Sequence, residues 1–233
     1  MKSIRDKAIN VLQYDSEEIK FTQGAAVRRM FAENLLPKLK NVDGKKILDV
    51  GFGEGWLCGE LAKLGTDVVG IDPSIKNIKY VEAKYSDIKF YRSSLQEFKT
   101  TEHFDFVIAT MVLEHISDLE NAFLKLKSLL KRGGKILIVT GDFDLFTRQR
   151  RDYKVETEII GPGEVAARTD YGEGLGVIYD IIRKPDITIK RAKSAGLTLV
   201  SHIPVITPEW FIEEDSYNIR HKDKPIFQLF VFS

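Results

Sequence analysis

The sequence predicts an α/β protein built on a doubly wound, seven-stranded, mostly parallel sheet. From residue 45 to the C-terminus, short apolar runs alternate with segments of helical periodicity. The runs are apolar on both faces, which is typical of strands that helices cover on both sides of a sheet. Glycines follow three of the helical segments, where left-handed caps commonly end a helix before the chain returns to the sheet.

Each element can be placed by its pattern. The predicted strands are the apolar runs 46–50, 67–71, 88–92, 104–109, 135–140, 197–202 and 226–232. The predicted helices have apolar residues at spacings of three and four, and they cover 56–64, 75–85, 119–130 and 187–195. Caps are expected at Gly65, Gly133 and Gly196.

The composition excludes several classes of protein. The 35 Lys and Arg residues balance 34 Asp and Glu, and 43% of residues are hydrophobic. This is too apolar for a disordered chain, and a net charge of +1 provides no field for nucleic acid or an anionic membrane. The single cysteine, Cys58, cannot form an internal disulfide. No signal peptide is recognisable, and no apolar run reaches the ~18 residues of a membrane span, so we expect a cytoplasmic protein.

Two segments lie outside the alternation of strands and helices. Residues 1–44 have helical periodicity, whereas residues 141–184 are rich in glycine between Gly161 and Gly176. Without these segments the chain is close to the ~150 residues of a typical domain. We therefore expect one domain over 1–233, with 1–44 as a helical cap and 141–184 as a substrate-side insertion that forms a lid. The alternative for 141–184 is a loop without function.

The strongest local signal is the glycine-rich sequence LDVGFGEGW at 48–56, which directly joins the first strand to the first helix. A strand, a glycine turn and a helix N-terminus together bring backbone N–H groups close to a ligand. The alternative is a tight turn without a ligand. One ordinary turn rarely needs three glycines at alternate positions, which favours a binding site.

The spacing within this turn discriminates between ligands. A dinucleotide-binding turn has its third glycine where this chain has Trp56, and the charge of Asp49 would oppose a pyrophosphate. The pattern is instead that of a ligand that presents an amino group. Asp72 ends the second strand, about 20 residues further on, where an acid commonly binds a ribose diol. The alternative for Asp72 is a turn before Pro73.

Four ordered segments resemble the successive motifs of class I S-adenosylmethionine (SAM)-dependent methyltransferases. They are 48–56, 70–74, 104–115 and 130–139. The tripeptide LEH at 113–115 and the opening KKILDVG are similar to the small-molecule branch typified by the ubiquinone-biosynthesis O-methyltransferases. The resemblance covers about residues 45–140. It implies a Rossmann-like fold with strand order 3-2-1-4-5-7-6 and an antiparallel last strand, with SAM as cofactor and S-adenosylhomocysteine as its product.

The resemblance also implies cofactor contacts at the ends of the first four strands. The glycines would line the methionine and ribose side, and the acids would lie near the amino group and the ribose hydroxyls. Relatives often have an acid beside the adenine, where this chain offers a serine hydroxyl or a leucine backbone. The implied residues are Asp49, Gly51, Gly53, Gly55, Asp72, Pro73, Ser94, Leu95, Ala109 and Thr110.

His115 is the candidate catalytic residue. Methyl transfer requires alignment of the acceptor and exclusion of water, and it requires a base only when the acceptor arrives protonated. His115 follows the fourth strand at the edge where ligands of such sheets bind, and its reference pKa is near neutrality. The alternative is a structural histidine bonded to backbone. Asp118 is expected to be a helix cap.

No metal is predicted. Small-RNA 3′-end methyltransferases resemble this family and use E-x-x-E-H with a later histidine as a metal site. Here Met111 stands at the first acid position, and 141–146 contains no histidine. Glu114 and His115 alone supply too few ligands.

The substrate side is predicted from rings and charges in the two extra segments and beside the fourth strand. The candidates are Tyr14, Arg28, Glu114, Arg148, Tyr153, Tyr171 and Tyr179, with Arg150 and Arg151 beside Arg148. The N-terminal helices are also expected to cover the cofactor, with Tyr14, Phe21, Gln23 and Arg28 as contacts. The arginines could hold a carboxylate or phosphate, or they could form a solvated face.

The predicted function is SAM-dependent methyl transfer to an oxygen or nitrogen of a small molecule, without a membrane or nucleic-acid partner. The alternatives are an RNA or protein methyltransferase, a nucleotide-binding protein without turnover, and an NAD-dependent oxidoreductase, which Trp56 and Asp49 disfavour. Neither the acceptor nor the oligomeric state is encoded in these patterns.

Overall fold

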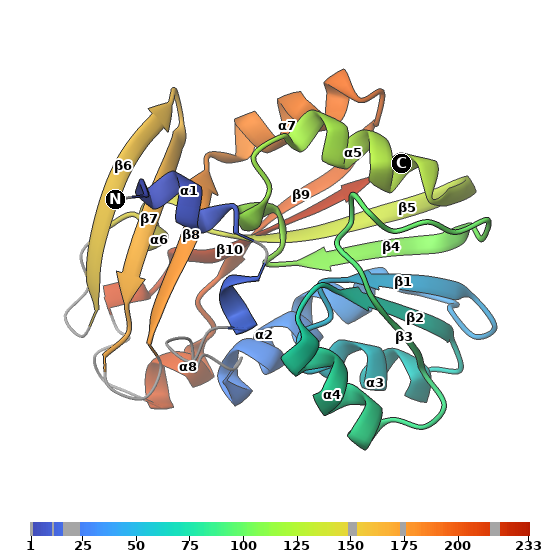
Figure 1. Cartoon of the computed structure of the whole chain (residues 1–233). Helices are drawn as coiled ribbons and strands as arrows, with labels where there is room; N and C mark the ends of the chain where they lie inside the picture. Colours follow the sequence, from blue (N-terminus) through green and yellow to red (C-terminus); the bar gives the residue numbers. More distant parts are fainter. Residues whose placement is uncertain (1, 11, 16–23, 149–152, 173–175, 215–219) are drawn as a thin grey trace.

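The computed structural model describes residues 2–10, 12–15, 24–148, 153–172, 176–214 and 220–233, and these form a seven-stranded sheet and a separate three-stranded sheet (Figure 1). The large sheet has the order β3-β2-β1-β4-β5-β10-β9. Strands β1 to β5 pair in parallel, and β10 pairs antiparallel to β5 and β9. Its strands are β1 (Lys46–Val50), β2 (Asp67–Asp72), β3 (Lys89–Arg92), β4 (Phe104–Thr110), β5 (Leu130–Gly141), β9 (Leu199–Ile206) and β10 (Pro225–Phe232). The predicted strand order and antiparallel strand are confirmed.

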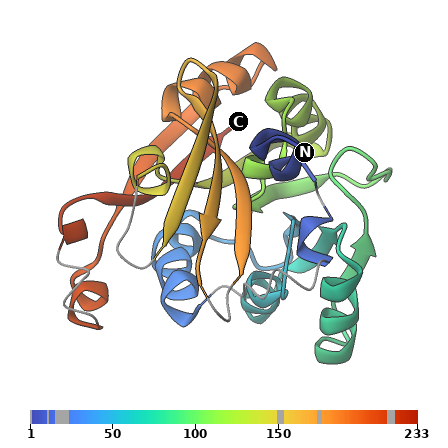
Figure 2. The same cartoon turned by 60° about the vertical axis from the view of Figure 1, so that its left-hand side comes forward.

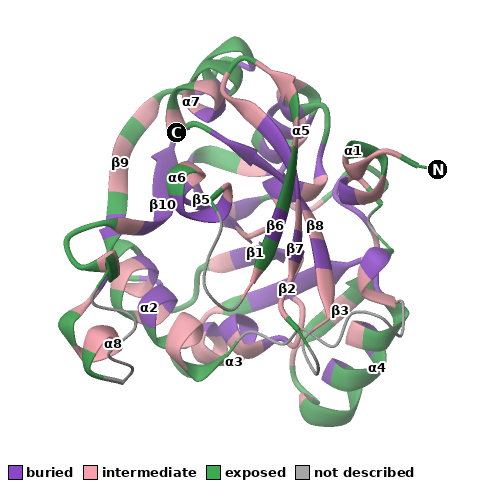
Figure 3. Cartoon of the chain, turned by 90° about the vertical axis from the view of Figure 1, so that its left-hand side faces the viewer, coloured by how far each residue is buried: buried purple, intermediate pink, exposed green. Residues whose placement is uncertain are grey.

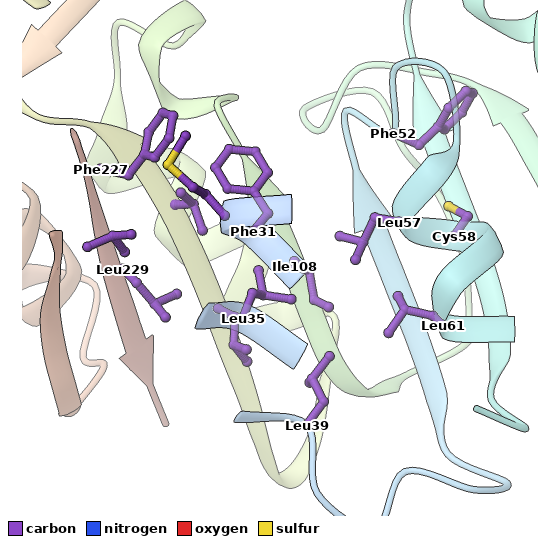
Figure 4. Close-up of a cluster of buried hydrophobic side chains, with 14 of the residues drawn as sticks. Phe31, Leu35, Leu39, Phe52, Leu57, Cys58, Leu61, Ile108, Phe227 and Leu229 are labelled. Carbon is purple, nitrogen blue, oxygen red and sulfur yellow. The ribbon is translucent and has the colours of Figure 1, made fainter. Parts of the chain in front are cut away.

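Helices cover both faces of the large sheet (Figure 1). The helices on one face are α2 (Ala25–Leu35), α3 (Trp56–Lys63) and α4 (Ile75–Lys84), and those on the other are α5 (Leu119–Ser128) and α7 (Pro185–Ser194). Strand β1 serves both cores, because successive side chains point to opposite faces. Ile47 packs with α2 and α3, whereas Leu48 and Val50 pack with α5 and α7. Figure 4 shows part of the first cluster around α2 and α3.

The helix starts follow ordinary capping chemistry. Ser74 accepts a hydrogen bond from the Asn77 amide at the start of α4. Asp118 accepts one from the Asn121 amide at the start of α5, which confirms the predicted cap. Between β4 and α5 lies the short 3-10 helix η3 (Leu113–His115), which carries the candidate histidine.

Residues 141–184 contain a second sheet that the sequence patterns did not predict. After α6 (Phe143–Phe146), strands β6 (Lys154–Gly161), β7 (Glu164–Asp170) and β8 (Val177–Arg183) form an antiparallel sheet in that order (Figure 2). Two of the glycines that suggested a lid lie at the tight β6–β7 turn, where Gly163 has a φ of 75°. Strand β6 is largely exposed, whereas β7 and β8 carry most of the buried residues (Figure 3).

The N-terminal strap, described at residues 4–10 and 12–15, joins the two sheets across the site. It contains α1 (Ile4–Ala8) and the 3-10 helix η1 (Gln13–Asp15). The Ile4 amide donates to Glu158 of β6 at 3.0 Å. The remaining described elements are η2 (Leu36–Lys38), which continues α2, and α8 (Glu209–Glu214). In the described part of the chain, no helix is long and apolar enough to cross a membrane.

Candidate cofactor and acceptor site

A cavity of about 470 Å³ lies at the carboxyl ends of β1, β2 and β4. Its walls come from the glycine turn, the N-terminal strap, α2 and the small sheet. The volume is within the range of ordinary small-molecule sites. Most of the predicted site residues line it, namely Tyr14, Arg28, Asp49, Gly51, Gly53, Asp72, Pro73, Ser94, Leu95, Thr110, His115, Tyr153 and Tyr171.

Two of the implied cofactor residues lie beside the cavity wall rather than in it. Gly55 is the N-cap of α3, and a Cβ there would come within 2.8 Å of Val81 on α4. Its φ of 70° and the packing of α3 on α4 therefore explain this glycine without a ligand contact. Ala109 is 1% exposed and belongs to the core on the α5 side of the sheet.

Three predicted substrate-side residues lie away from the cavity. Glu114 is 2% exposed and accepts the Gly141 amide at 2.9 Å, so it ties η3 to the end of β5. Arg148 is exposed and donates to the Asp144 carbonyl. Tyr179 accepts from the Lys7 ammonium at 3.1 Å on the strap. Phe21, Gln23, Arg150 and Arg151 lie outside the described residues.

Asp49 is the buried acid of the site. Its side chain is held in the apolar layer between β1 and α3, and it is 1% exposed. The Cys58 thiol donates to Oδ2 at 3.2 Å, whereas Oδ1 is buried and has no hydrogen-bond partner in the part of the chain that the structure describes. Burial, together with the neighbouring Asp72 charge and against the opposing thiol hydrogen bond, raises the pKa of Asp49 to about 7. An unpaired carboxylate oxygen at a cavity wall suits a cationic ligand group.

Asp72 is fixed by its own loop. Its Oδ2 accepts the Gly53 amide at 3.0 Å, and its Oδ1 accepts the Ser74 amide at 2.9 Å and the Asn77 side chain at 3.2 Å. Burial raises the pKa of Asp72, and the bonds from Ser74 and Gly53 oppose this rise. The carboxylate is therefore held in one orientation next to the glycine turn.

The glycine turn leaves room for a ligand at one position only. A Cβ on Gly53, which has a φ of 56°, would meet nothing within 4 Å, and this residue lines the cavity. A Cβ on Gly51 would lie 2.4 Å from Val112 Cγ2. Gly53 therefore exposes backbone to the cavity, whereas Gly51 allows β1 to pass close to the β4 loop.

His115 is held by the strap. Its Nδ1 lies 3.3 Å from the Ala8 carbonyl, which can only accept, and 3.1 Å from Gln13 Nε2, whose two protons go to the Ala8 and Tyr179 carbonyls, so we assign the proton to Nδ1. Its Nε2 then carries the lone pair, and the Tyr14 hydroxyl is 3.1 Å away. Burial lowers the pKa of His115 to about 4, so the ring is neutral at physiological pH. Asp180 Oδ1 lies 3.7 Å from Nε2.

Several residues that shape the site could not be recognised in the sequence. Gln13 donates to the Ala8 and Tyr179 carbonyls, and it accepts the Tyr179 amide, so it fixes the strap to β8. Asp180 reaches the cavity from the same strand. These residues come from the two segments without strand–helix alternation, where no periodic pattern indicates which side chains face inward.

Arg183 on β8 holds the loop that carries His115. It is 7% exposed and donates to the Leu113 and Ile116 carbonyls at 2.7 and 2.6 Å, and to Glu164 at 2.8 Å. Two buried carbonyls on either side of the histidine are thus satisfied by one guanidinium.

The rest of the cavity wall is mainly apolar. Apolar side chains line it from α2, α6, the small sheet, α8 and β10, namely Val27, Met30, Leu145, Phe146, Ile178, Phe211, Ile226 and Phe227. Such a surface suits an acceptor with an apolar body. Among the described residues, no group of three or more His, Cys, Asp or Glu side chains could hold a metal ion.

The sheet order, the glycine turn and the paired acids define a Rossmann-like protein of the methyltransferase class. A solved SAM-dependent methyltransferase from Mesorhizobium loti has the same fold, with a TM-score of 0.69 and 20% identity, over 87% of this chain and 97% of that one. The family model described as a methyltransferase domain matches residues 22–159, more than half of the chain. The chain belongs to this family.

Two curated relatives match about half of the chain. A ubiquinone biosynthesis O-methyltransferase from Bradyrhizobium sp. (strain ORS 278) is 34% identical over 125 residues, which are 52% of this chain and 48% of that protein. The human mitochondrial ubiquinone biosynthesis O-methyltransferase is 39% identical over 123 residues, 46% of this chain and 33% of that protein. The match thus spans about half the length of the first relative and a third of the second.

Proposed function

We propose that the chain is a SAM-dependent methyltransferase that acts on an oxygen of a small molecule, with nitrogen as the second candidate. The observation that carries the proposal is the buried Asp49 Oδ1, which has no hydrogen-bond partner among the described residues, on a side chain that lines the same cavity as Gly53 and Asp72. A dinucleotide would bring phosphates to this wall, where two acids repel them. SAM brings an ammonium group and a ribose diol, which these acids can bind.

Each polar residue then has one task. Gly53 offers backbone, Asp49 binds the cofactor's amino group, and Asp72 binds the ribose hydroxyls. Ser94 and Leu95 line the wall expected to hold the adenine. The bound sulfonium supplies the methyl group. Orientation and exclusion of water are the contributions of the protein.

His115 is proposed to take the proton of a hydroxyl acceptor at Nε2. Its neutral ring leaves a lone pair at that atom, and the imidazolium formed there would lie 3.7 Å from the Asp180 carboxylate, which stabilises it. Burial raises the pKa of Tyr14, so its hydroxyl stays protonated. When the acceptor takes the place of this hydroxyl at His115 Nε2, the hydroxyl can donate its hydrogen bond to the acceptor oxygen instead. The proposed cap (1–44) and insertion (141–184) close over this acceptor.

The choice of oxygen rests on the two curated relatives, both of which are named O-methyltransferases. The acceptor wall is mainly apolar and comes from α2, α6, the small sheet, α8 and β10. We therefore propose a small apolar acceptor, and we leave its identity to experiment.

Calorimetry tests the cofactor assignment. S-adenosylhomocysteine should bind, and NADH should not. Asp72→Ala should weaken S-adenosylhomocysteine by at least about tenfold, the scale of one hydrogen bond to a charged group. Asp67→Ala, at the exposed other end of β2, is the matched control and should bind normally. Binding of NADH alone, or normal binding by Asp72→Ala, would contradict the assignment.

Turnover is tested with labelled SAM in metabolite extract, followed by mass spectrometry. Label in a small molecule supports the proposal. Loss of label after nuclease or protease treatment would instead indicate an RNA or protein acceptor. Tight binding without any labelled product would indicate a nucleotide-binding protein without turnover.

A further inference from the structure

Asp49 and Cys58 form a buried pair between β1 and α3. Cys58 is fully buried on the face of α3 that packs against the sheet (Figure 4). Its thiol lies 3.2 Å from Asp49 Oδ2, and none of the described residues forms a hydrogen bond with the other carboxylate oxygen. The two oxygens of one side chain therefore have different environments. One faces a donor in the core, and the other is left for the cavity.

This arrangement constrains the carboxylate without neutralising it. The last torsion of an aspartate is broad, so a buried carboxylate needs a donor to fix its plane. A thiol is a weak neutral donor, whereas a lysine or arginine at the same place would cancel the negative charge. Cys58 thus fixes the orientation of Asp49 and leaves the charge on Oδ1 available to a cation.

We propose that Cys58 is a positioning residue that, through its thiol hydrogen bond to Asp49, sets the affinity of the site for the aliphatic ammonium group of the cofactor. This inference rests on the proposed function. It assigns Cys58 no contact with the cofactor, since the thiol acts through Asp49 alone.

The charged groups around Asp49 indicate which pH dependence to expect. Asp72 faces it from β2 and Cys58 from α3, while the Arg28–Glu54 ion pair of α2 and the glycine turn lines the same cavity. Because the pKa of Asp49 is about 7, an ammonium ligand should bind more tightly as pH rises through 7. The thiol hydrogen bond lowers the pKa of Asp49, so its loss should raise that pKa. The pH range over which the ligand affinity increases should then move to higher pH.

The test compares two ligands and two variants. S-adenosylhomocysteine carries the amino group, and 5′-methylthioadenosine keeps the adenosine and the thioether but lacks it. Cys58→Ala should weaken S-adenosylhomocysteine by about tenfold at pH 7.5 and change methylthioadenosine by less than about twofold, on the scale of a hydrogen bond to a charged group. Cys58→Ser keeps a donor and should restore binding to within about threefold of the wild type.

Two further measurements separate positioning from packing. The pH at which the S-adenosylhomocysteine affinity is half-maximal should be higher in Cys58→Ala than in the wild type, and Cys58→Ser should have the wild-type value. In an Asp49→Asn background, Cys58→Ala should have no further effect on S-adenosylhomocysteine, since the thiol acts only through the carboxylate. Thermal melts confirm that each variant is folded at the temperature used.

The outcomes are distinct. Equal loss of both ligands in Cys58→Ala, unchanged S-adenosylhomocysteine affinity in folded Cys58→Ala, or an additive effect in the Asp49→Asn background would overturn the positioning role. If wild-type protein does not bind S-adenosylhomocysteine at all, the proposed function itself fails. If only Cys58→Ala is unstable, the pH dependence of S-adenosylhomocysteine affinity in Cys58→Ser still tests the inference. Serine retains a donor to Asp49, so a pH dependence shifted from that of the wild type would contradict the positioning role.

Discussion

Gly51 and Gly53 lie two residues apart in one turn, yet each position requires glycine for a different reason. Both have positive φ angles, 70° and 56°, so alanine at either position is strained by roughly 1–2 kcal/mol. At Gly51 the added methyl also overlaps Val112, whereas at Gly53 it enters open space in the cavity. Backbone strain is common to both positions, and only the surroundings of the added methyl group differ.

We therefore predict opposite phenotypes for the two alanine variants. Gly51→Ala should lower the unfolding free energy by about 2–4 kcal/mol, since overpacking adds to strain, and the folded fraction should keep near-normal cofactor affinity. Gly53→Ala should lose only about 1–2 kcal/mol of stability but should weaken S-adenosylhomocysteine by more than about tenfold. Urea denaturation and calorimetry measure the two effects. Equal effects of both variants on both quantities would refute the separation.

The sequence predicted the acids and the glycines because their spacing relative to one strand and one helix is fixed by backbone geometry. Asp49, Gly53 and Asp72 all line the cavity. Ligand contact and close packing leave the same glycine signature, so the sequence could not separate Gly53 from Gly55. Likewise, Glu114 beside His115 could not be known to point away, because a 3-10 turn sends neighbouring side chains in different directions.

At the scale of elements, the strap connects both halves of the site. Gln13 bonds the backbone of β8, and Asp15 bonds the start of α4, where its Oδ1 accepts the Ser74 hydroxyl at 2.5 Å and its Oδ2 accepts the Ile75 amide at 3.3 Å. A carboxylate at a helix N-terminus is favourable because it meets the unpaired amides and the positive end of the helix dipole. The strap is therefore fastened beside Asp72 through Asp15 and beside His115 through Ala8 and Gln13.

Removing the α4 contact should loosen the strap and speed cofactor release. We expect Asp15→Ala to raise the dissociation rate of S-adenosylhomocysteine by about fivefold, since an N-terminal cap contributes roughly 1 kcal/mol. Stopped-flow displacement measures this rate. Asp6→Ala, an exposed position on α1 with the same charge change, should leave it unaltered. A wild-type rate in Asp15→Ala would mean that the strap does not limit release.

The central sheet was predictable from its alternation of strands and helices, but the small sheet was not. Strands β6 and β7 are joined by a tight glycine turn, and a glycine-rich stretch of sequence does not distinguish a turn from a flexible loop. Only one of the eight β6 residues is buried, and β6 lacks the apolar run by which the other strands were found. Antiparallel strands with one solvated face give a weaker signal than buried parallel ones.

At the scale of the whole molecule, three buried groups make stability depend on pH. Burial raises the pKa of Glu114 to about 7 from its ordinary 4.5, and that of Asp49 to about 7 from 3.8. Burial also lowers the pKa of His115 to about 4 from 6.5. Between pH 4.5 and 6.5 the native state holds two carboxyl protons that the unfolded chain has lost, and the unfolded chain holds one histidine proton that the native state lacks.

The net proton count fixes the sign of the effect. Across these three groups the native state binds one more proton than the unfolded chain in this window, and two more between pH 6.5 and 7, so the unfolding free energy should fall as pH rises and level off above 7. The raised pKa of buried Asp72 acts in the same direction. Carboxyls whose pKa is lowered in the native state, such as those of Asp105 and Asp118, change stability only below about pH 4. They do not alter the slope near neutrality.

Glu114→Gln should abolish most of this slope. Glutamine can still accept the Gly141 amide, and with one carboxyl removed the proton counts of the two states become equal between pH 4.5 and 6.5. Relative to wild type, the variant should gain about 3 kcal/mol of unfolding free energy from pH 4.5 to pH 8, at about 1.4 kcal/mol per pKa unit. Urea denaturation across this range measures it, with exposed Glu82→Gln on α4 as control. Parallel pH profiles for wild type and Glu114→Gln would show that Glu114 is ionised in the native state, its charge balanced by the nearby Arg183.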